Sequence, residues 1–298
     1  MAKFLWAAAY EAWAAWSPAR CIRRENPWLV RSQAMAEMSE YENTSEHSGA
    51  LHSVLQRLWP EVRRRHLYPE LPFPRFERGG SRAAVEMYNK QITLNLNYIR
   101  ETTRLLPAET VVGALLDHAV SHHTFCPWDL FTHLRLYARA KEILGDNELA
   151  RKATDLFMDV VADTHAVKEK QSPLPELYRH GARSSLEEVI FSLYERIWGV
   201  DLGGSRDHQD VVGRLLTIPY LDRKRWPAAL TRFIRGIRPF LEKTHYSRPE
   251  EQTRMGAHGF QQYRPEEMER ALREFAREAS SPEQFATIFE DLQDQLPD

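Results

Sequence analysis

The chain has 298 residues, of which 43% are hydrophobic and 28% charged, and this is ordinary for a globular protein of one large domain or two small ones. With 40 basic and 42 acidic residues its net charge is -2, a balance that points to no nucleic-acid partner and no anionic membrane. Two cysteines, Cys21 and Cys126, make no disulfide framework, so we expect a cytoplasmic protein.

Residues 1–48 are predicted to be a poorly ordered leader and linker. The first 16 residues place a lysine ahead of an apolar run, as a signal peptide does, but Glu11 interrupts that run. The run is also too short to span a bilayer, and no other segment approaches that length. Three interpretations of this leader stay open: an amphipathic surface helix, a weak export signal, or translated sequence upstream of a start at Met35 or Met38.

A helix followed by a β-hairpin is predicted next. Apolar residues recur at helical spacing over 51–67, and three prolines between 69 and 74 then favour an extended connection. Residues 83–88 and 91–96 are predicted to be two short strands, since apolar and polar residues alternate in the second. Asn89 and Lys90 suit the turn between them.

The rest of the chain is predicted to be helical. Pro107 suits the start of a helix that covers 111–123, Asp129 suits the N-cap of a helix over 130–144, and a long helix follows over 148–168. Later helices are expected over 185–198, 225–243, 265–279 and 282–296, with 245–263 as an exposed linker. The expected fold is therefore mainly α with a small β-sheet or hairpin (α+β).

Two histidines four residues apart are the most informative motif. His118 and His122 would lie on one face of the helix, which is the spacing that offers two imidazoles to one zinc ion. Zinc peptidases carry a glutamate directly after the first histidine as general base, but here that residue is Ala119. The neighbouring Asp117 points about 100° away on the helix and is expected to lie too far to replace it.

An acidic stripe on the long helix predicts a third ligand. Asp155, Asp159 and Asp163 follow one another at steps of four among apolar residues, where a carboxylate is expensive to bury alone. A Zn²⁺ ion shared with the two histidines would offset that cost. We expect Asp159 to be the third ligand and Asp163 to accept the second N–H of a ligating histidine, with a fourth position open to water.

Simpler interpretations are preferred for the other candidates. Asp155 is expected to face solvent near the helix start, and His123 to be a hydrogen-bonded partner off the metal face. His165 is expected to be a surface or capped histidine, and Cys126 a small hydrophobic residue. His133 would be a ligand only if its helix folded back over the first.

Glu187 and Glu188 come at the start of the helix over 185–198. First-turn acidic residues interact favourably with the helix dipole, and this is their simplest role. Either is also a candidate for the missing general base.

The order of these elements and motifs along the chain resembles that of a known family over roughly residues 75–170. A hairpin, a helix with two histidines four apart and a later helix with two acids four apart are similar to the gluzincin branch of zinc metallopeptidases. Within it the chain looks like bacterial and archaeal metallopeptidase-like proteins whose histidine helix ends in a Cys-Pro-aromatic-Asp turn, here residues 126–129. The resemblance implies a zincin-like core over 49–200, followed by a C-terminal helical extension over 201–298. Ala119 and Asp159 depart from the family's glutamates.

Three functions follow as hypotheses. The first is a metal-dependent, peptidase-like hydrolase, and the second is a catalytically degenerate relative that binds a peptide or protein in the same cleft. The third is a helical protein-interaction module without metal. Without a positioned base, hydrolysis would be slower by roughly a hundred- to ten-thousand-fold.

Overall fold

The computed structural model describes residues 49–78, 83–180, 183–247, 256–257, 259–279 and 281–293. Its contacts divide the chain into one unit over Met1–His52 and a second, compact unit over Ser53–Asp298. The predicted leader over 1–48 lies outside the described residues. Positions on both sides of residue 200, where the C-terminal extension was expected to begin, belong to the second unit.

A small sheet contains the predicted hairpin. Strands β2 (Val85–Tyr88) and β3 (Gln91–Asn95) are antiparallel, which confirms the hairpin, and Asn89 and Lys90 form its turn with φ of 47° and 65°. A two-residue hairpin needs such positive φ values. Two further strands, β1 (Arg75–Glu77) and β4 (Gly256–Ala257), run parallel to β3 and β2 and give the order β1-β3-β2-β4.

Helices make up most of the described chain and confirm the expected mainly α fold with a small sheet. One of them covers 53–65. The others are α3 (Leu96–Thr102), α4 (Ala108–Thr124), α5 (Leu130–Leu144), α6 (Asn147–Lys170), α7 (Leu174–Tyr178), α8 (Ser185–Trp198), α9 (Gln209–Leu216), α10 (Trp226–Ser247), α11 (Pro265–Glu278) and α12 (Pro282–Gln293). Within the described ranges, no helix is long and apolar enough to cross a bilayer.

Local hydrogen bonds explain where several helices begin. The Asp129 carboxylate accepts from the backbone N–H of Thr132 at 2.8 Å, as expected of the N-cap of α5. Leu96, predicted to end a strand, is instead the first residue of α3. Its neighbour Asn95 caps that helix by accepting from the backbone N–H groups of Asn97 and Tyr98 at 3.0 and 3.2 Å. The short helices α3, α7 and α9 were not predicted.

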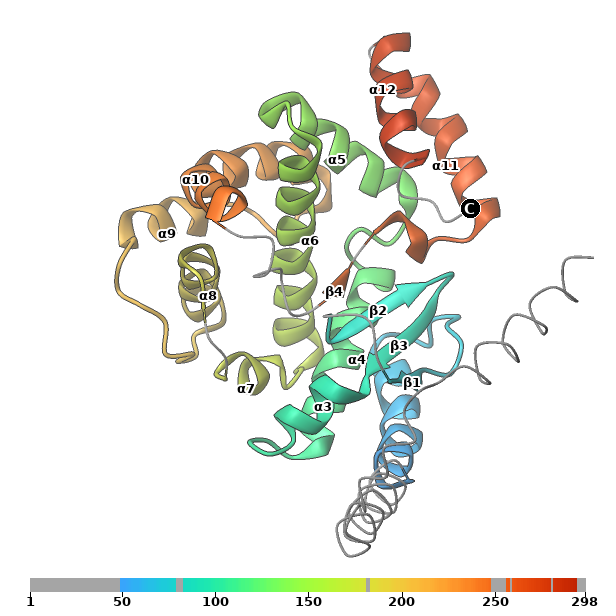
Figure 1. The fold of residues 1–298 in the computed structure, drawn as a ribbon, viewed down its shortest axis with the longest axis vertical. Coiled ribbons are helices and arrows are strands. Elements are labelled where there is room, and N and C mark those ends of the chain that lie inside the picture. Colours follow the sequence, from blue (N-terminus) through green and yellow to red (C-terminus); the bar gives the residue numbers. More distant parts are fainter. Residues whose placement is uncertain are drawn as a thin grey trace, which may run out of the picture. The chain divides into compact units, whose positions relative to one another are not determined.

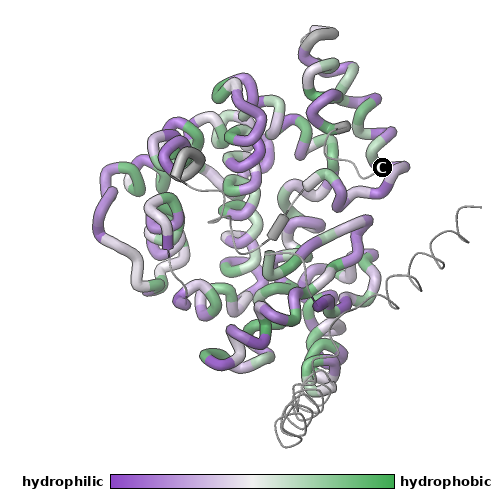
Figure 2. Tube along the Cα trace, in the orientation of Figure 1, coloured by the Kyte–Doolittle hydropathy of each residue, from purple (hydrophilic) through white to green (hydrophobic). Residues whose placement is uncertain are grey.

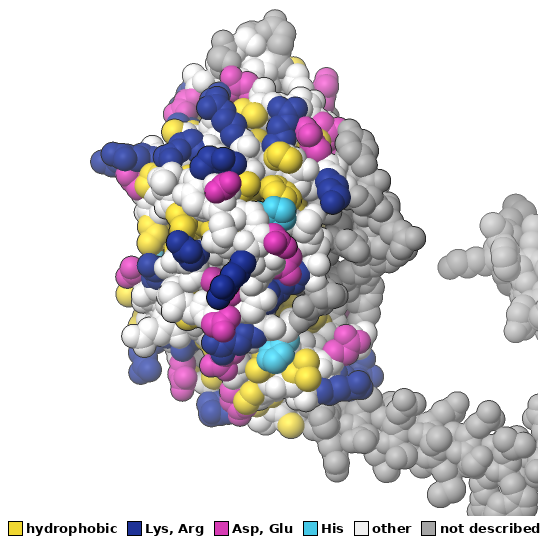
Figure 3. Space-filling view, turned by 90° about the vertical axis from the view of Figure 1, so that its left-hand side faces the viewer, with side chains coloured by type: hydrophobic (Ala, Val, Ile, Leu, Met, Phe, Trp, Pro, Cys, Tyr) yellow, Lys and Arg dark blue, Asp and Glu magenta, His cyan; other side chains and the backbone are white. Residues whose placement is uncertain are grey.

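Helix α6 lies at the centre of the helical packing. It contacts α4 and α5, and α10 packs against both α5 and α6, while α11 packs on α5 (Figure 1). Apolar and polar stretches alternate along the α6 tube (Figure 2), and residues such as Phe157 and Val161 are fully buried. On the face of the molecule drawn in Figure 3, basic and acidic side chains are interspersed. The α4–α6 contact in the core positions the candidate site.

Candidate metal centre

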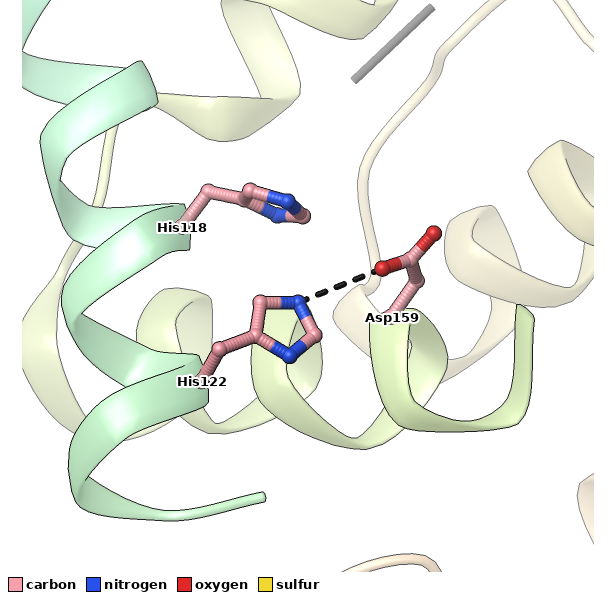
Figure 4. Close-up of side chains that lie close together, drawn as sticks. All are labelled: His118, His122 and Asp159. Atoms are coloured by element: carbon pink, nitrogen blue, oxygen red, sulfur yellow. Dashed lines mark ion pairs between the residues drawn. The ribbon is translucent and has the colours of Figure 1, made fainter. Parts of the chain in front are cut away.

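Helix α4 presents two histidines to the interior. Their rings are four residues apart with centroids 4.7 Å from each other, and both project toward α6 (Figure 4). The exposed fraction is 0% for His118 and 1% for His122. Two buried imidazoles on one helix face are what the sequence spacing predicted, because 3.6 residues complete each helical turn.

Asp159 of α6 completes a cluster of three potential ligands. Oδ1 of Asp159 lies 3.2 Å from Nε2 of His122, and one ligand atom from each of His118, His122 and Asp159 lies within 4.8 Å of the others. Ligands about 2 Å from a tetrahedral zinc ion lie about 3.3 Å apart. The three residues predicted as ligands lie together, and the pair at 3.2 Å matches this spacing, whereas separations of up to 4.8 Å would have to shorten around an ion. Two imidazoles with one carboxylate suit zinc.

Asp163 orients the first histidine. Its Oδ1 accepts a hydrogen bond from Nδ1 of His118 at 2.6 Å, so Nδ1 carries the proton and Nε2 keeps its lone pair for a ligand. Burial alone would lower the pKa of His118, but the charge and hydrogen bond of Asp163, with the charge of Asp159, raise it above its ordinary value. Asp163 thus makes the contact predicted for it.

Two tyrosines complete the surroundings of Asp163. The hydroxyls of Tyr178 on α7 and Tyr194 on α8 donate to Oδ2 of Asp163 at 2.6 and 3.0 Å. Burial, and then the charge of Asp163, raise the pKa of both tyrosines well above the usual range, so their hydroxyls stay protonated as donors. Sequence reasoning missed both, because each occupies an apolar helical position and no local pattern marks its hydroxyl.

Asp155 is less exposed than predicted, and the expectation that it faces solvent is wrong. The residue is half-buried, its Oδ1 is shielded from solvent, and no described residue forms a hydrogen bond with that oxygen. Burial, and then the charge of Asp159 one helical turn away, raise the pKa of this carboxyl well above its usual range. The reason is that α6 packs into the core on more than one side.

The candidate bases on α8 support the start of that helix. Glu187 completes a capping box, in which the backbone N–H of Ser184 donates to its Oε2 at 2.7 Å. Oε2 of Glu188 accepts from the backbone N–H of Ser205 at 2.9 Å. Both lie about two helical turns, or ~10 Å along α8, before Tyr194, which is the residue of this helix that contacts Asp163. Glu187 therefore has the first-turn role, whereas Glu188 binds the loop at Ser205, and neither carboxylate belongs to the clustered ligand atoms of the described chain.

Asp117 also lies outside the cluster, as expected. Its two carboxylate oxygens each accept from Nη2 of Arg65 at 2.9 Å, and one lies 3.2 Å from Nε2 of His66. This buried ion pair occupies a different face of α4 from the two candidate ligands. Asp117 is therefore engaged in packing the helix over 53–65 against α4.

The remaining candidates lie around the cluster. Cys126 is buried, and burial raises the pKa of its thiol, so it stays protonated and packs as a small hydrophobic residue. His165 stacks on Phe125 with ring centroids 3.9 Å apart, and burial, then the charge of Lys170, lowers its pKa to about 4. Nδ1 of His133 lies 3.3 Å from the hydroxyl of Tyr263, so this histidine contacts the C-terminal region instead of joining the ligand cluster.

A pocket of about 200 Å³ opens beside the second candidate ligand, His122. Part of its wall comes from residues 262–263, within the stretch predicted to be an exposed linker. That prediction is wrong for its end, because Phe260, Gln262 and Tyr263 are buried. The lining residues are Met87, Lys90, His122, His123, Trp128, Asp129, Leu130, Phe131, Gln262, Tyr263, Glu267, Arg270, Ala271 and Glu274.

His123 belongs to this pocket and not to the ligand cluster. Burial, and then the nearby charge of Lys90, lowers its pKa to about 4, so its imidazole is neutral at pH 7. The sequence placed His123 off the metal face, and nothing in the local pattern showed that a pocket adjoins it.

Comparisons of the chain with protein-family models, with curated proteins and with solved structures return no match. The gluzincin-like core and the peptidase-type function expected from the sequence therefore stay predictions.

Proposed function

We propose that the chain is a zinc-binding, metallopeptidase-like protein in which His118, His122 and Asp159 hold the ion. The supporting observation is the convergence of two imidazole nitrogens and one carboxylate oxygen within 4.8 Å in the protein interior. Three such ligands with a fourth position for water are the donor set of catalytic zinc sites. Magnesium and calcium prefer sites made of oxygen ligands, so the two imidazoles favour zinc over them.

The chain's own residues supply orientation and a place for a ligand. Asp163 holds the ring of His118 through its Nδ1 atom, and the pocket beside His122 provides room for a substrate. A zinc ion in such a site acidifies water and polarises a carbonyl group. A carbonyl ligand in this pocket would lie next to the zinc site, as a peptidase-like function requires.

A second candidate, a catalytically degenerate relative that binds without cleaving, is favoured by Ala119. This residue is 2% exposed, and its methyl group accepts no proton. A positioned base is worth roughly a hundred- to ten-thousand-fold in rate. With Glu187 and Glu188 both engaged at the start of α8, we expect peptide binding with little hydrolysis.

Zinc content and affinity test the metal site. The purified full chain is expected to bind one zinc ion per molecule, measured by elemental analysis and by competition with a chromophoric chelator. His118→Ala, His122→Ala and Asp159→Ala should each lose most of this affinity. His180→Ala and Asp207→Asn are matched controls on exposed positions and should keep it. Unchanged zinc content in His118→Ala would show that the site is wrong, and a parent protein without zinc would favour the metal-free interaction module.

Hydrolysis of a peptide mixture separates the two metal-dependent candidates. We expect little or no cleavage by the parent protein, and a gain of chelator-sensitive cleavage in Ala119→Glu, provided circular dichroism shows that the variant folds. Efficient cleavage by the parent would reject the degenerate relative. Cleavage that persists after chelation would reject a zinc-dependent mechanism.

A further inference from the structure

The segment over residues 259–263 is fixed against the hairpin turn and α5. Backbone N–H groups of Asn89 and Lys90 donate to the carbonyl oxygens of Gln261 and Gln262 at 2.9 and 3.0 Å. The hydroxyl of Tyr263 donates to the carbonyl oxygen of Asp129 at 3.3 Å. Gln262 is thus held by backbone hydrogen bonds at Gln261 and at its own carbonyl group, and by the side chain of Tyr263, which fixes its place in the pocket wall.

The side-chain amide of Gln262 is a buried donor. Gln262 is 3% exposed, and its Nε2 has no hydrogen-bond acceptor among the residues that the structure describes. A buried amide N–H without an acceptor is costly, and most such groups in folded proteins are satisfied. Nε2 is shielded in the structure, but Gln262 lines the same pocket as His122, so a small shift of its side chain would bring this donor to an oxygen acceptor bound there.

The residues that line the pocket and its volume indicate the polarity and size of the rest of the ligand. Met87, Leu130, Phe131 and the ring of Trp128 supply apolar and aromatic surface. The volume of about 200 Å³ is smaller than the roughly 300–1,000 Å³ of typical small-molecule sites. It therefore suits one amino-acid residue or a small acyl group and not a large cofactor.

The charged residues of the pocket are largely paired with each other. Glu267 accepts a hydrogen bond from Lys90, and Oε1 of Glu274 lies 3.3 Å from Nε of Arg270. Each acidic side chain of α11 in the lining therefore has a basic partner in the same lining. This balance favours a ligand without net charge, since a charged one would have to compete with these pairs.

We propose that Gln262 donates its side-chain amide to the carbonyl oxygen of a neutral, peptide-like ligand whose bulky apolar side chain fills this pocket. That this ligand is the part of a substrate next to the zinc ion rests on the proposed function. Its binding to Gln262 in the pocket does not. Gln262 is thus a positioning and specificity residue contributed by the C-terminal part of the chain.

Binding of N-acetyl-L-phenylalaninamide to the zinc-loaded full chain tests the proposal, with N-acetylglycinamide as the probe that lacks the apolar side chain. By NMR titration we expect the first to bind and the second to bind much more weakly. Gln262→Leu should weaken binding of the first at least about tenfold, because one hydrogen bond to the carbonyl is lost. Gln261→Leu, next in sequence and outside the pocket lining, should leave it unchanged.

The thermal unfolding midpoint gives an independent readout. Gln262→Leu should unfold at the same temperature as the parent or higher, since it removes a buried donor that lacks an acceptor. If this variant does not fold, Gln262→Glu keeps the size of the side chain and replaces the donor by a carboxylate that repels the carbonyl oxygen. It should show the same loss of binding.

Equal affinity in the parent and the Gln262 variants would overturn the proposal, as would equal binding of the two probes or no binding to the parent. Zinc content measured on the same samples separates the two conclusions. If the protein contains zinc and the Gln262 variants bind the probe as well as the parent does, only the role of Gln262 is rejected. Gln262-dependent binding without zinc keeps the pocket and rejects the proposed metal function.

Discussion

The position of one proton decides whether α4 is able to offer two ligands. The 2.6 Å hydrogen bond to Asp163 keeps that proton on Nδ1 of His118. Nε2 is then the basic atom of the ring, and His118 belongs to the cluster with His122 and Asp159. Burial removes competing water, so the tautomer is set by the protein and not by solvent.

His165 should make stability depend on pH. Its pKa falls from 6.5 to about 4 in the folded chain, so the unfolded chain takes up a proton that the folded chain does not. The contribution of neutral His165 to the free energy of unfolding is complete above pH 6.5 and is lost as the pH falls toward 4. His165→Phe keeps a ring on Phe125 and should flatten this loss by up to ~1.4 kcal/mol per pH unit.

Urea unfolding in the presence of a chelator, from neutral pH down to about 4, measures the effect. The exposed His180→Phe is the matched control and should retain the parent's pH dependence. If the parent and His165→Phe lose stability in parallel, the depressed pKa of His165 is not the cause.

The candidate ligands and Asp163 could be predicted from the sequence, whereas the two tyrosines that contact Asp163 could not. His118 and His122 follow from helical periodicity, and Asp159 and Asp163 from acids at steps of four in an apolar run. Tyr178 and Tyr194 reach Asp163 from two other helices, and such distant contacts leave no local pattern. Asp155 was misjudged because its exposure depends on tertiary packing.

At the scale of elements, Asp163 connects four helices. Its carboxylate on α6 accepts from His118 on α4, from Tyr178 on α7 and from Tyr194 on α8. Hydrogen bonds to a charged acceptor are stronger than neutral ones, so this buried carboxylate holds the four helices in register. If zinc binds as proposed, its affinity and the packing of α7 and α8 should be linked in both directions.

Asp163→Asn tests this link. We expect zinc affinity to fall about 10- to 100-fold, because the amide is a poorer acceptor for His118 and holds the ring less firmly. Competition with a chromophoric chelator measures the loss, and circular dichroism checks the fold. Tyr178→Phe, which removes one of the two hydroxyl donors to Oδ2, should have a smaller effect. An unchanged affinity in Asp163→Asn would show that the hydrogen bond does not support the ligand.

Long, periodic elements were predicted better than short ones. The hairpin of β2 and β3 and the helices α4, α5, α6 and α8 follow from alternation, helical spacing and capping residues. Strand β4 has two residues and exists only because the C-terminal segment pairs with β2, so its formation depends on a non-local contact. Helix α3 replaces the end of a predicted strand because Asn95 caps it.

At the scale of the whole molecule, the pocket combines distant parts of the sequence. The hairpin contributes Met87 and Lys90, α4 contributes His122, and α11 contributes Glu267 and Ala271. The sequence predicted only a C-terminal helical extension in this part of the chain. It could not show which residues of this extension line the pocket. No motif near positions 262–263 indicates a contact with residues more than 100 positions earlier.

This arrangement sets an order of assembly during translation. A ribosome releases a chain from its N-terminus, so the three candidate zinc ligands emerge about 100 residues before Gln262 and Tyr263. If the proposed site binds zinc, a nascent chain would thus be able to take up the ion before the neighbouring pocket wall is synthesised. A product that stops before residue 259 would carry all three candidate ligands and still lack part of the pocket wall.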